Sequence, residues 1–203
     1  MSKKKITILI AAVLIAAVTA TTVFLTCFHN ETSTFTASPA VTIETPSKIS
    51  RLKKGQFSLD VKLTSLGKAS YPASSFSIDF DSSKLEFMGI GEGNVTVTDA
   101  GNTSGHKLPE WSVNVDRSNK IGQINIMYLD TTGGKYAFSN SLLSKEKNVL
   151  MKLKFRLRDS VSDGDICELS FCDAVFAASD DTKSLASANG TLKTNNGRIV
   201  IGE

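Results

Sequence analysis

The sequence has little of what enzymes commonly use for catalysis. Its 203 residues include only two histidines, His29 and His106. His29 lies in a Thr/Ser-rich segment, so a Ser-His-Asp or Cys-His system could use only His106, and nothing in the Gly/Asn-rich sequence around it supports that role. The chain has no H-E-x-x-H motif, no paired-cysteine zinc motif and no glycine-rich phosphate loop. Spacing alone leaves a carboxylate pair for glycoside hydrolysis open, but Asp79 and Asp81 are more simply solvated strand residues. We therefore expect a protein that is not an enzyme.

Cysteine is also scarce. Of the three cysteines, Cys167 and Cys172 fall in one expected strand, five positions apart. This odd spacing places them on opposite faces, and at about 3.3 Å per residue they lie about 16 Å apart. A disulfide requires Cα atoms within about 7 Å of each other. We expect both thiols to be unpaired, although a bulge between them would change the spacing.

The chain carries little net charge. The formal value is +3, and part of it comes from Lys3, Lys4 and Lys5 near the N-terminus. Basic patches with interleaved aromatic residues, which mark nucleic-acid-binding proteins, are missing. Nucleic acid is therefore not an expected partner.

The N-terminal lysines precede an uncharged, mostly apolar run from Ile6 to Phe28. Such a segment is typical of an export signal, and it is long enough to span a bilayer, which takes about 20 helical residues. Cleavage after Val18-Thr19-Ala20 would release the rest of the chain. Without cleavage, residues 6–28 would form a hydrophobic helix that anchors it, with the lysines inside. The sequence before Cys27 also resembles a lipoprotein box, a third route to the membrane. In each case we expect the remainder to be extracellular or at the cell surface.

Helical periodicity is missing from the rest of the chain, apart from a short turn that residues 140–147 could hold. Apolar and polar residues alternate instead, which indicates half-buried strands. Regular turn signals between these runs predict an all-β fold of about nine strands, a sandwich of two antiparallel sheets, with residues 116–122 as a turn. The expected strands include residues 41–44, 57–63, 75–80, 85–90, 111–115, 124–128, 149–157, 167–171 and 196–201. The predicted parts are a signal peptide or membrane anchor (1–28), a Thr/Ser-rich tether (29–39) and the sandwich domain (40–203).

Two acidic loops have residue types that bind calcium. Asp163 and Asp165 flank Gly164, and Asp180 and Asp181 follow an expected strand. Carboxylates in loops are preferred calcium ligands, but neither loop has the spacing of a helical calcium-binding loop. Turn chemistry accounts for both. Calcium therefore stays an alternative, and no other cofactor or metal is expected.

The ordered set of strands resembles the cohesin family. The strand that ends at Phe80-Asp81, the polar turn after it and Leu85-Glu86 are similar to that family's signature, with Phe80 where the family mostly has Tyr. One segment departs from the pattern, because Ala178-Ser179 stand before Asp180. The resemblance covers about residues 41–202, and it also rests on residues 56–66, 124–130, 149–157 and 196–202. It implies a nine-stranded jelly-roll sandwich that is not catalytic and that binds a calcium-loaded dockerin carried by another protein, typically a polysaccharide-degrading enzyme.

Two other functions fit the same sandwich. One is a carbohydrate-binding module, whose partner would be a polysaccharide, and the other is a structural or adhesion domain of the cell surface. Sugar-binding faces usually need exposed aromatic platforms. Trp111 and Tyr128 are in phase with core residues, so only Tyr71 and Tyr136 remain as candidate platforms.

The strand phase also selects candidate residues for partner binding. If Phe76, Ile78 and Phe80 face the core, then the residues between them face outward, and the same holds for the strand around Ile126. Met127 and Leu129 would then be two exposed apolar residues next to a polar row, which suggests a contact surface. A lid loop or an edge contact that covers Met127 is the alternative. In cohesins the corresponding strands form the dockerin-binding face, although Ser75 stands where many members carry a carboxylate. The predicted binding residues are Ser75, Ser77, Asp79, Asn125, Met127 and Leu129.

Overall fold

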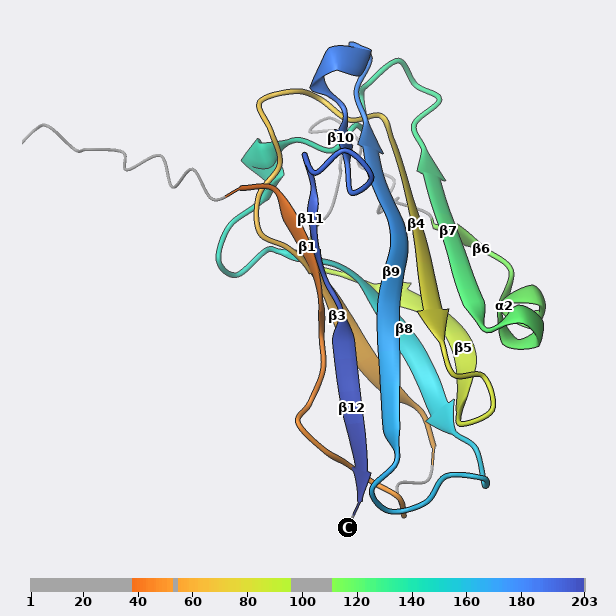
Figure 1. The fold of residues 1–203 in the computed structure, drawn as a ribbon. Coiled ribbons are helices and arrows are strands. Elements are labelled where there is room, and N and C mark those ends of the chain that lie inside the picture. The colour runs from red at the N-terminus through yellow and green to blue at the C-terminus, as the bar shows by residue number, and fades with distance from the viewer. Residues whose placement is uncertain (1–37, 53–54, 96–110, 203) are drawn as a thin grey trace, which may run out of the picture. The chain divides into compact units, whose positions relative to one another are not determined.

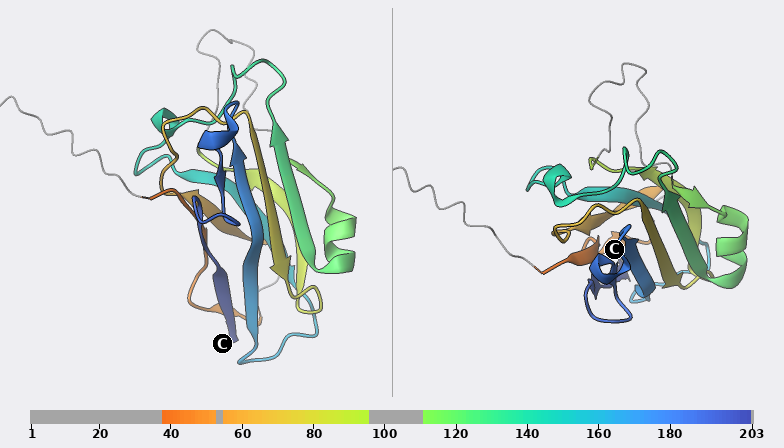
Figure 2. Two further views of the ribbon diagram at one scale, coloured as in Figure 1. Left: turned by 45° about the horizontal axis from the view of Figure 1, so that its top comes forward. Right: turned by 90° about the horizontal axis from the view of Figure 1, so that it is seen from above.

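The computed structural model describes residues 38–52, 55–95 and 111–202. Their strands form two sheets that pack face to face as separate layers (Figures 1 and 2). The predicted β-sandwich is therefore confirmed. The expected N-terminal helix, the cleavage site and the tether up to residue 37 lie outside the described residues, as does His106. Within the described ranges, no helix is long and apolar enough to cross a membrane.

The first sheet contains five strands in the order β11-β1-β3-β8-β5. Its strands come from both ends and the middle of the chain, so long-range pairing closes this layer. Their bounds are β1 Ala40–Glu44, β3 Phe57–Leu63, β5 Leu85–Glu92, β8 Val149–Leu157 and β11 Lys193–Asn195.

The second sheet has the order β2-β12-β9-β4-β7-β6, and a short strand β10 also pairs with β9. β9 and β4 lie in its centre. The bounds are β2 Ile49–Ser50, β4 Ala73–Phe80, β6 Ser112–Val113, β7 Gln123–Leu129, β9 Ile166–Ala177, β10 Leu185–Ala186 and β12 Gly197–Gly202. Two single-turn 3-10 helices, η1 Asn140–Leu142 and η2 Asp181–Lys183, lie in loops.

The core lies between the two layers, where the alternation of the strands predicts it. In β4, Phe76, Ile78 and Phe80 are each at most 7% exposed. The inward residues of β7, β3 and β8 are buried against them, and the rings of Phe80, Phe87 and Phe155 contact one another. Burial of this apolar surface is the main source of the fold's stability.

The turn between β4 and β5 carries the chain from one sheet to the other. Asp81 starts it: its carboxylate accepts a hydrogen bond from the Ser83 N–H at 2.9 Å, and its carbonyl accepts one from the Leu85 N–H at 2.9 Å. β4 then pairs with β7 and β9, whereas β5 pairs with β8. The two signature strands therefore face each other across the core and do not pair.

The sheets are mixed, which corrects the expectation of a purely antiparallel sandwich. β1 pairs parallel with β11, and β2 pairs parallel with β12. The reason is that the N-terminal and C-terminal segments run side by side, and each passes from the first sheet into the second. At the start of β12, Gly197 lies so close to β1 that a Cβ there would be 2.9 Å from the Ile43 side chain. Alternation along one strand does not reveal the direction of its neighbour.

A helix, α2, spans Val115–Ile121 where the sequence predicted the end of a strand and a turn. The Asn114 side chain caps it by accepting a hydrogen bond from the Arg117 N–H at 2.9 Å. Gly122 ends it in the left-handed conformation, with φ of 70°. An Asn cap and a Gly just past the last turn are helix signals, but seven residues are too few for the apolar period to show.

The two cysteines of β9 are free, with Cys167 buried and Cys172 exposed. Across from β9, Ile78 pairs with Phe171 and Ser77 pairs with Asp173, so Cys172 is the extra residue of a bulge. The bulge shifts the phase of β9, and Ala174 and Phe176 point into the core in place of odd-numbered residues.

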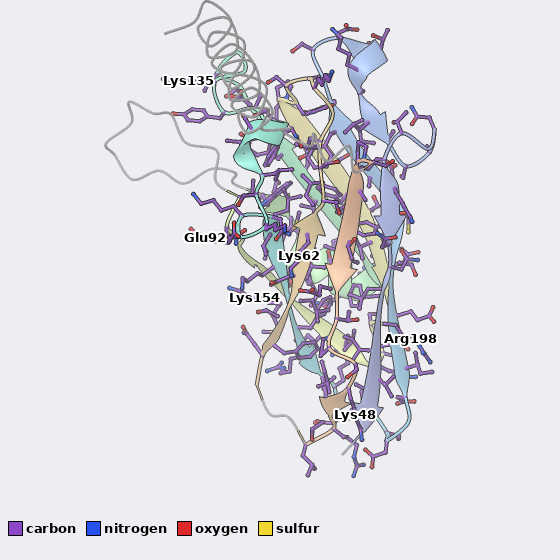
Figure 3. The ribbon with its side chains drawn as sticks, turned by 90° about the vertical axis from the view of Figure 1, so that its left-hand side faces the viewer. Lys48, Lys62, Glu92, Lys135, Lys154 and Arg198 are labelled. Atoms are coloured by element: carbon purple, nitrogen blue, oxygen red, sulfur yellow. The ribbon has the colours of Figure 1, made fainter. Side chains whose placement is uncertain are left out.

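The outer face of the first sheet carries charged side chains, among them Lys62 and Lys154 (Figure 3). The Lys62 ammonium lies 2.5 Å from Glu44, Lys152 lies 3.5 Å from Asp60, and Arg156 pairs with Glu86. Cross-strand pairs of this kind favour the observed register. In each of these three pairs the opposite charges balance.

Candidate functional site

The register of β4 and β7 brings all six residues predicted for partner binding onto one surface. Ser75 lies opposite Met127, Ser77 opposite Asn125, and Asp79 opposite Gln123. Leu129 lies one row further along, opposite Ala73. We call this surface the β4–β7 face, made of the outward residues Ala73, Ser75, Ser77, Asp79, Gln123, Asn125, Met127 and Leu129.

Apolar exposure is concentrated at one end of the β4–β7 face. Met127 is 57% exposed and Leu129 is 62% exposed, while Ile126 and Tyr128 between and beside them are buried. The described residues that neighbour Met127 therefore leave most of its side chain open. Two large apolar side chains that stay in solvent add no buried surface to the fold. The pair therefore suits a contact surface.

A chain of side-chain hydrogen bonds runs along the other part of the face. The Ser77 hydroxyl donates to Asn125 Oδ1 at 2.8 Å, and Asn125 Nδ2 donates to Gln123 Oε1 at 3.2 Å. Gln123 Nε2 in turn donates to Asp79 Oδ1 at 2.8 Å. These bonds hold the polar groups in defined orientations, and such preorganisation lowers the entropy cost of binding a ligand. The Asp79 carboxylate ends the chain with acceptor capacity left over.

Gln123 is a member of the face that sequence reasoning missed. It lies two residues before Asn125, so its outward phase could have been recognised by extending the alternation to the first residue of the strand. Its amide links Asp79 to Asn125 and also lies 3.9 Å from the Cys172 sulfur. Gln123 thus joins β7 to both β4 and β9.

Strand β9 extends the surface on the other side of β4. Val175 lies opposite Ser75, and Asp173 lies opposite Ser77. Val175 is half-buried and adds to the apolar end, and Asp173 accepts a hydrogen bond from the Ser187 hydroxyl at 3.3 Å. These residues were not predicted, because the bulge at Cys172 reverses the phase of β9 and because cross-strand neighbours are not visible in the sequence.

The loop after β7 is fixed beside Leu129 by a buried carboxylate. Asp130 accepts hydrogen bonds from the backbone N–H groups of Thr132 at 2.8 Å and Tyr136 at 3.1 Å. Burial alone would raise the pKa of Asp130, but these hydrogen bonds outweigh it and hold the pKa below its usual value. The Tyr128 hydroxyl donates to the Tyr136 carbonyl at 2.7 Å, and burial raises the pKa of Tyr128 to about 12. The loop next to the apolar end of the β4–β7 face is therefore held in place by hydrogen bonds.

Cys172 lies at the polar end of the face, but its thiol has low nucleophilic reactivity. Burial and the neighbouring Asp79 carboxylate raise the pKa of the thiol above its ordinary value. A thiol is nucleophilic only as the thiolate, so Cys172 stays a neutral neighbour of Asp79 and Gln123. The face offers hydrogen-bond groups and apolar contact area, which suit binding.

The acidic loops considered for calcium use their carboxylates in local structure. Asp165 pairs with Lys84 at 3.1 Å, and Asp163 lies 3.5 Å from Arg51. Asp180 caps η2 by accepting from the Thr182 N–H and pairs with Lys183 at 2.9 Å. Asp181 lies within η2 and is exposed. Among the described residues, no group of three or more His, Cys, Asp or Glu could hold a metal ion.

The prediction that Tyr71 could be an exposed sugar-binding platform is wrong. Tyr71 is only 1% exposed and packs edge-on against Phe176. The interpretation as an exposed residue failed because Tyr71 belongs to a loop that bridges to Phe138, inside the core. Tyr136 is half-buried, with the Lys135 ammonium 5.8 Å from its ring centre. Trp111 packs against the rings of Phe76, Tyr128 and Phe138, as its phase predicted.

Several solved cohesin structures have a fold similar to that of this chain. No model of a known protein family and no curated protein sequence matches the chain. The sixth cohesin of scaffoldin B from Acetivibrio cellulolyticus, solved with a Cel5 dockerin, is 18% identical with a TM-score of 0.57, and the match covers 81% of this chain and 99% of that chain. The OlpA cohesin from Clostridium thermocellum, also solved with a dockerin, is 17% identical with a TM-score of 0.57, at 81% and 99% coverage.

A cohesin from outside cellulosomes is similar as well. The non-cellulosomal cohesin of the archaeon Archaeoglobus fulgidus is 14% identical with a TM-score of 0.52, and the match covers 82% of this chain and 93% of that chain. At such low identities these similarities concern the fold. The resemblance found in the sequence is confirmed at that level: the domain has the cohesin jelly-roll fold.

Proposed function

We propose that this chain is a non-catalytic docking module of the cohesin type, which binds a dockerin-bearing protein through the β4–β7 face. The observation that carries the proposal is the exposed pair Met127 and Leu129 beside an ordered polar row on the same two strands. Several solved cohesins with the same fold are described as complexes with dockerins. The fold alone would not carry the proposal, since one fold can host many functions.

The chemistry of the face fits a helix as partner. A helix laid along β7 could place two apolar side chains, one turn apart, against Met127 and Leu129. Its polar side chains would then reach Ser75, Ser77, Asn125 and Asp79. None of the outward residues of β4 and β7 is basic, and Asp79 and Asp173 are acidic. A partner helix with lysine or arginine near its polar end would therefore be favoured.

The proposed location of the domain rests on its N-terminal sequence. The apolar segment 6–28 would export the domain or tether it to the membrane, so the partner would be met outside the cell or at its surface. The partner would be a calcium-loaded dockerin, carried on a polysaccharide-degrading enzyme. Calcium would then be bound by the partner, and this chain would supply no catalytic group.

Binding to dockerins from the same organism tests this function. The full chain, kept in a neutral detergent, is titrated by calorimetry with each dockerin module, first with calcium and then with excess chelator. Saturable one-to-one binding that disappears with the chelator is expected. Failure of every dockerin to bind, together with retention of the chain on insoluble polysaccharide, would favour a carbohydrate-binding module. Failure of both would favour a surface structural domain.

A further inference from the structure

The β4–β7 face continues at its polar end into an open hollow of about 490 Å³. The turn after β4 forms one wall, and the end of α2 with the start of β7 forms the other (Figure 1). The two walls are joined, because the Phe80 N–H donates to the Gly122 carbonyl at 2.9 Å. Asp79 and Gln123 belong both to the face and to the hollow. The lining consists of Asp79, Phe80, Asp81, Ser82, Ser83, Ile121, Gly122 and Gln123.

The lining carries two carboxylates and no cation. Asp79 Oδ1 accepts a hydrogen bond from Gln123 Nε2 at 2.8 Å. Asp81 Oδ1 accepts from the Ser83 hydroxyl and from the Ser83 N–H at 2.9 Å, and these bonds hold the pKa of Asp81 below its ordinary value. A carboxylate offers about four lone-pair sites. Both groups therefore keep the capacity to accept from a further donor.

Two cations near the turn lie outside the lining. Lys84 is 3.9 Å from Asp81 but pairs more closely with Asp165, at 3.1 Å. Arg158 donates from its Nε to the backbone carbonyl of Ser82 at 2.7 Å. In the part of the chain that the structure describes, no lysine or arginine forms an ion pair with Asp79. Asp79 is exposed and the Asp81 side chain is 40% exposed, so the lining presents two acidic groups to solvent.

Ile121 gives the hollow an apolar wall. It is the last residue of α2 and is 47% exposed, so much of its side chain stays in solvent. Gly122 directly after it has a φ of 70°, and a Cβ there would lie 3.0 Å from the Phe80 carbonyl oxygen. This close approach holds the end of α2 beside the two carboxylates. An aliphatic stem that ends in a cation, as in lysine and arginine, matches the combination.

The hydrogen-bonded row of the β4–β7 face ends at the hollow and has one direction. The Ser77 hydroxyl donates to Asn125, Asn125 donates to Gln123, and Gln123 donates to Asp79. An ionised carboxylate can only accept hydrogen bonds, so Asp79 sets the orientation of the amide next to it. The row thus closes on an acceptor, and a partner has to supply the donor at this end.

We propose that the hollow is the docking site for one arginine side chain of the partner helix. The guanidinium donates hydrogen bonds to the carboxylates of Asp79 and Asp81, and the methylene stem packs on Ile121. Residues two apart in a strand have Cα atoms about 6.6 Å apart and point to the same side. Arginine is favoured over lysine because its planar group can donate to two carboxylates at once. This site depends on the proposed function, since the helix that carries the arginine is the one that covers the β4–β7 face.

The geometry of β7 also sets the position of the arginine in the partner. Gln123 precedes Met127 by four residues, which is about 13 Å along the strand. A helix rises about 1.5 Å per residue, so about seven residues cover about 10.5 Å and return to the same side of the helix. The stem of the arginine spans the remainder. The arginine should therefore lie about seven residues from the apolar residue that covers Met127.

The chemistry of the hollow is tested on the full chain, in a neutral detergent, by titration with acetyl-arginine amide followed by amide chemical shifts. Shifts are expected at Ser82, Ser83, Gly122 and Gln123. Acetyl-citrulline amide has the shape of the arginine compound without its charge, and acetyl-lysine amide has the charge without the planar group. Each should bind at least about fivefold more weakly. No binding of the arginine compound, or equal binding of either comparison compound, would overturn the proposal.

Variants locate the arginine site on this chain. Asp79→Asn and Asp81→Asn keep the acceptor oxygens of their present hydrogen bonds, and each should weaken acetyl-arginine amide at least about fivefold. Asp116→Asn changes a carboxylate in the first turn of α2, outside the lining, and should bind like the parent chain. Ile121→Ser should weaken binding at least about twofold, whereas Leu52→Ser, at an exposed apolar residue elsewhere, should not. Equal losses in the control variants would show that the hollow is not the site.

A dockerin titration separates the arginine site from the proposed function. In a dockerin that binds the parent chain, the arginine at the expected position is changed to glutamine. This change and Asp79→Asn should each weaken the complex, and together they should weaken it little more than either alone, because both remove the same contact. A dockerin that binds the parent chain and the Asp79→Asn chain equally well would leave the proposed function standing and contradict the arginine site. If no dockerin binds the parent chain, the proposed function fails, and acetyl-arginine amide alone decides the chemistry of the hollow.

Discussion

The side-chain amide of Asn119 pairs with the backbone of Phe87 in both directions. The Phe87 N–H donates to Asn119 Oδ1 at 2.8 Å, and Asn119 Nδ2 donates to the Phe87 carbonyl at 2.8 Å. Phe87 belongs to β5, which lies at one edge of the first sheet. An open strand edge can pair with other chains, and proteins commonly cover such edges. The short helix α2 does so here, with the amide of Asn119 taking the place of a neighbouring strand.

Asn119→Ala should lower the free energy of unfolding by about 1–3 kcal/mol, because the buried Phe87 backbone groups lose both partners. Urea unfolding followed by fluorescence measures the change. Asn119→Asp keeps the acceptor for the Phe87 N–H and loses the donor. Its free energy of unfolding should therefore lie between those of the parent chain and of Asn119→Ala. A variant as stable as the parent chain would show that the amide does not support the edge.

Ser74→Ala should leave stability unchanged or raise it by up to about 1 kcal/mol, because a buried hydroxyl without a partner costs free energy. Ser74 is 2% exposed, and its hydroxyl oxygen has no hydrogen-bond partner among the described residues. Ser118→Ala is the matched control. Ser118 is equally buried, but its hydroxyl donates to the Asn114 carbonyl at 2.8 Å, so its loss should cost about 1 kcal/mol. Ser74→Ala should therefore unfold at a higher temperature than Ser118→Ala. The reverse order would refute the conclusion that the Ser74 hydroxyl lacks a hydrogen-bond partner.

Gly93→Ala should be strongly destabilising. A Cβ at this position would lie 2.1 Å from the Val149 carbonyl oxygen and 2.5 Å from the Leu150 carbonyl carbon, so the backbone of β8 would have to move. Gly133→Ala is the control: φ there is +79° but no atom lies within 4 Å, so only about 1 kcal/mol of backbone strain is expected. Comparable unfolding midpoints for the two variants would contradict the close approach of Gly93 to β8.

Asp130 should contribute to stability above the pKa of an unfolded aspartate, about 3.9. Its pKa in the folded protein is lowered, with the hydrogen bonds from Thr132 and Tyr136 outweighing burial. A depressed carboxyl pKa gives stability that is present above the unfolded value and is lost as the pH falls through the folded value. Asp130→Asn should therefore lower stability at neutral pH and flatten its decline in acid. Parallel curves for the variant and the parent between pH 5 and pH 2 would show that Asp130 is not the responsible group.

The sandwich and most of its inward residues could be predicted because the period of two sorts side chains between core and solvent. The same logic correctly placed Met127 and Leu129 outside and Phe76, Ile78 and Phe80 inside. It could not identify α2, whose seven residues carry capping signals but no visible apolar period. It also missed Asp173 and Val175, because the bulge at Cys172 reverses the phase of β9. Tyr71 was misplaced because loop residues have no alternation from which burial can be inferred.

The most direct test of the account is the affinity of a dockerin for Met127→Ser with Leu129→Ser. Truncating buried apolar anchors of an interface typically costs about 1–4 kcal/mol each. Calorimetry with the calcium-loaded dockerin should therefore show at least about a tenfold loss of affinity, with thermal unfolding unchanged. Ile166→Ser, which changes an exposed apolar residue at the other end of the same sheet, should bind like the parent chain. Full affinity in the folded double variant would contradict the central claim that the β4–β7 face binds the partner.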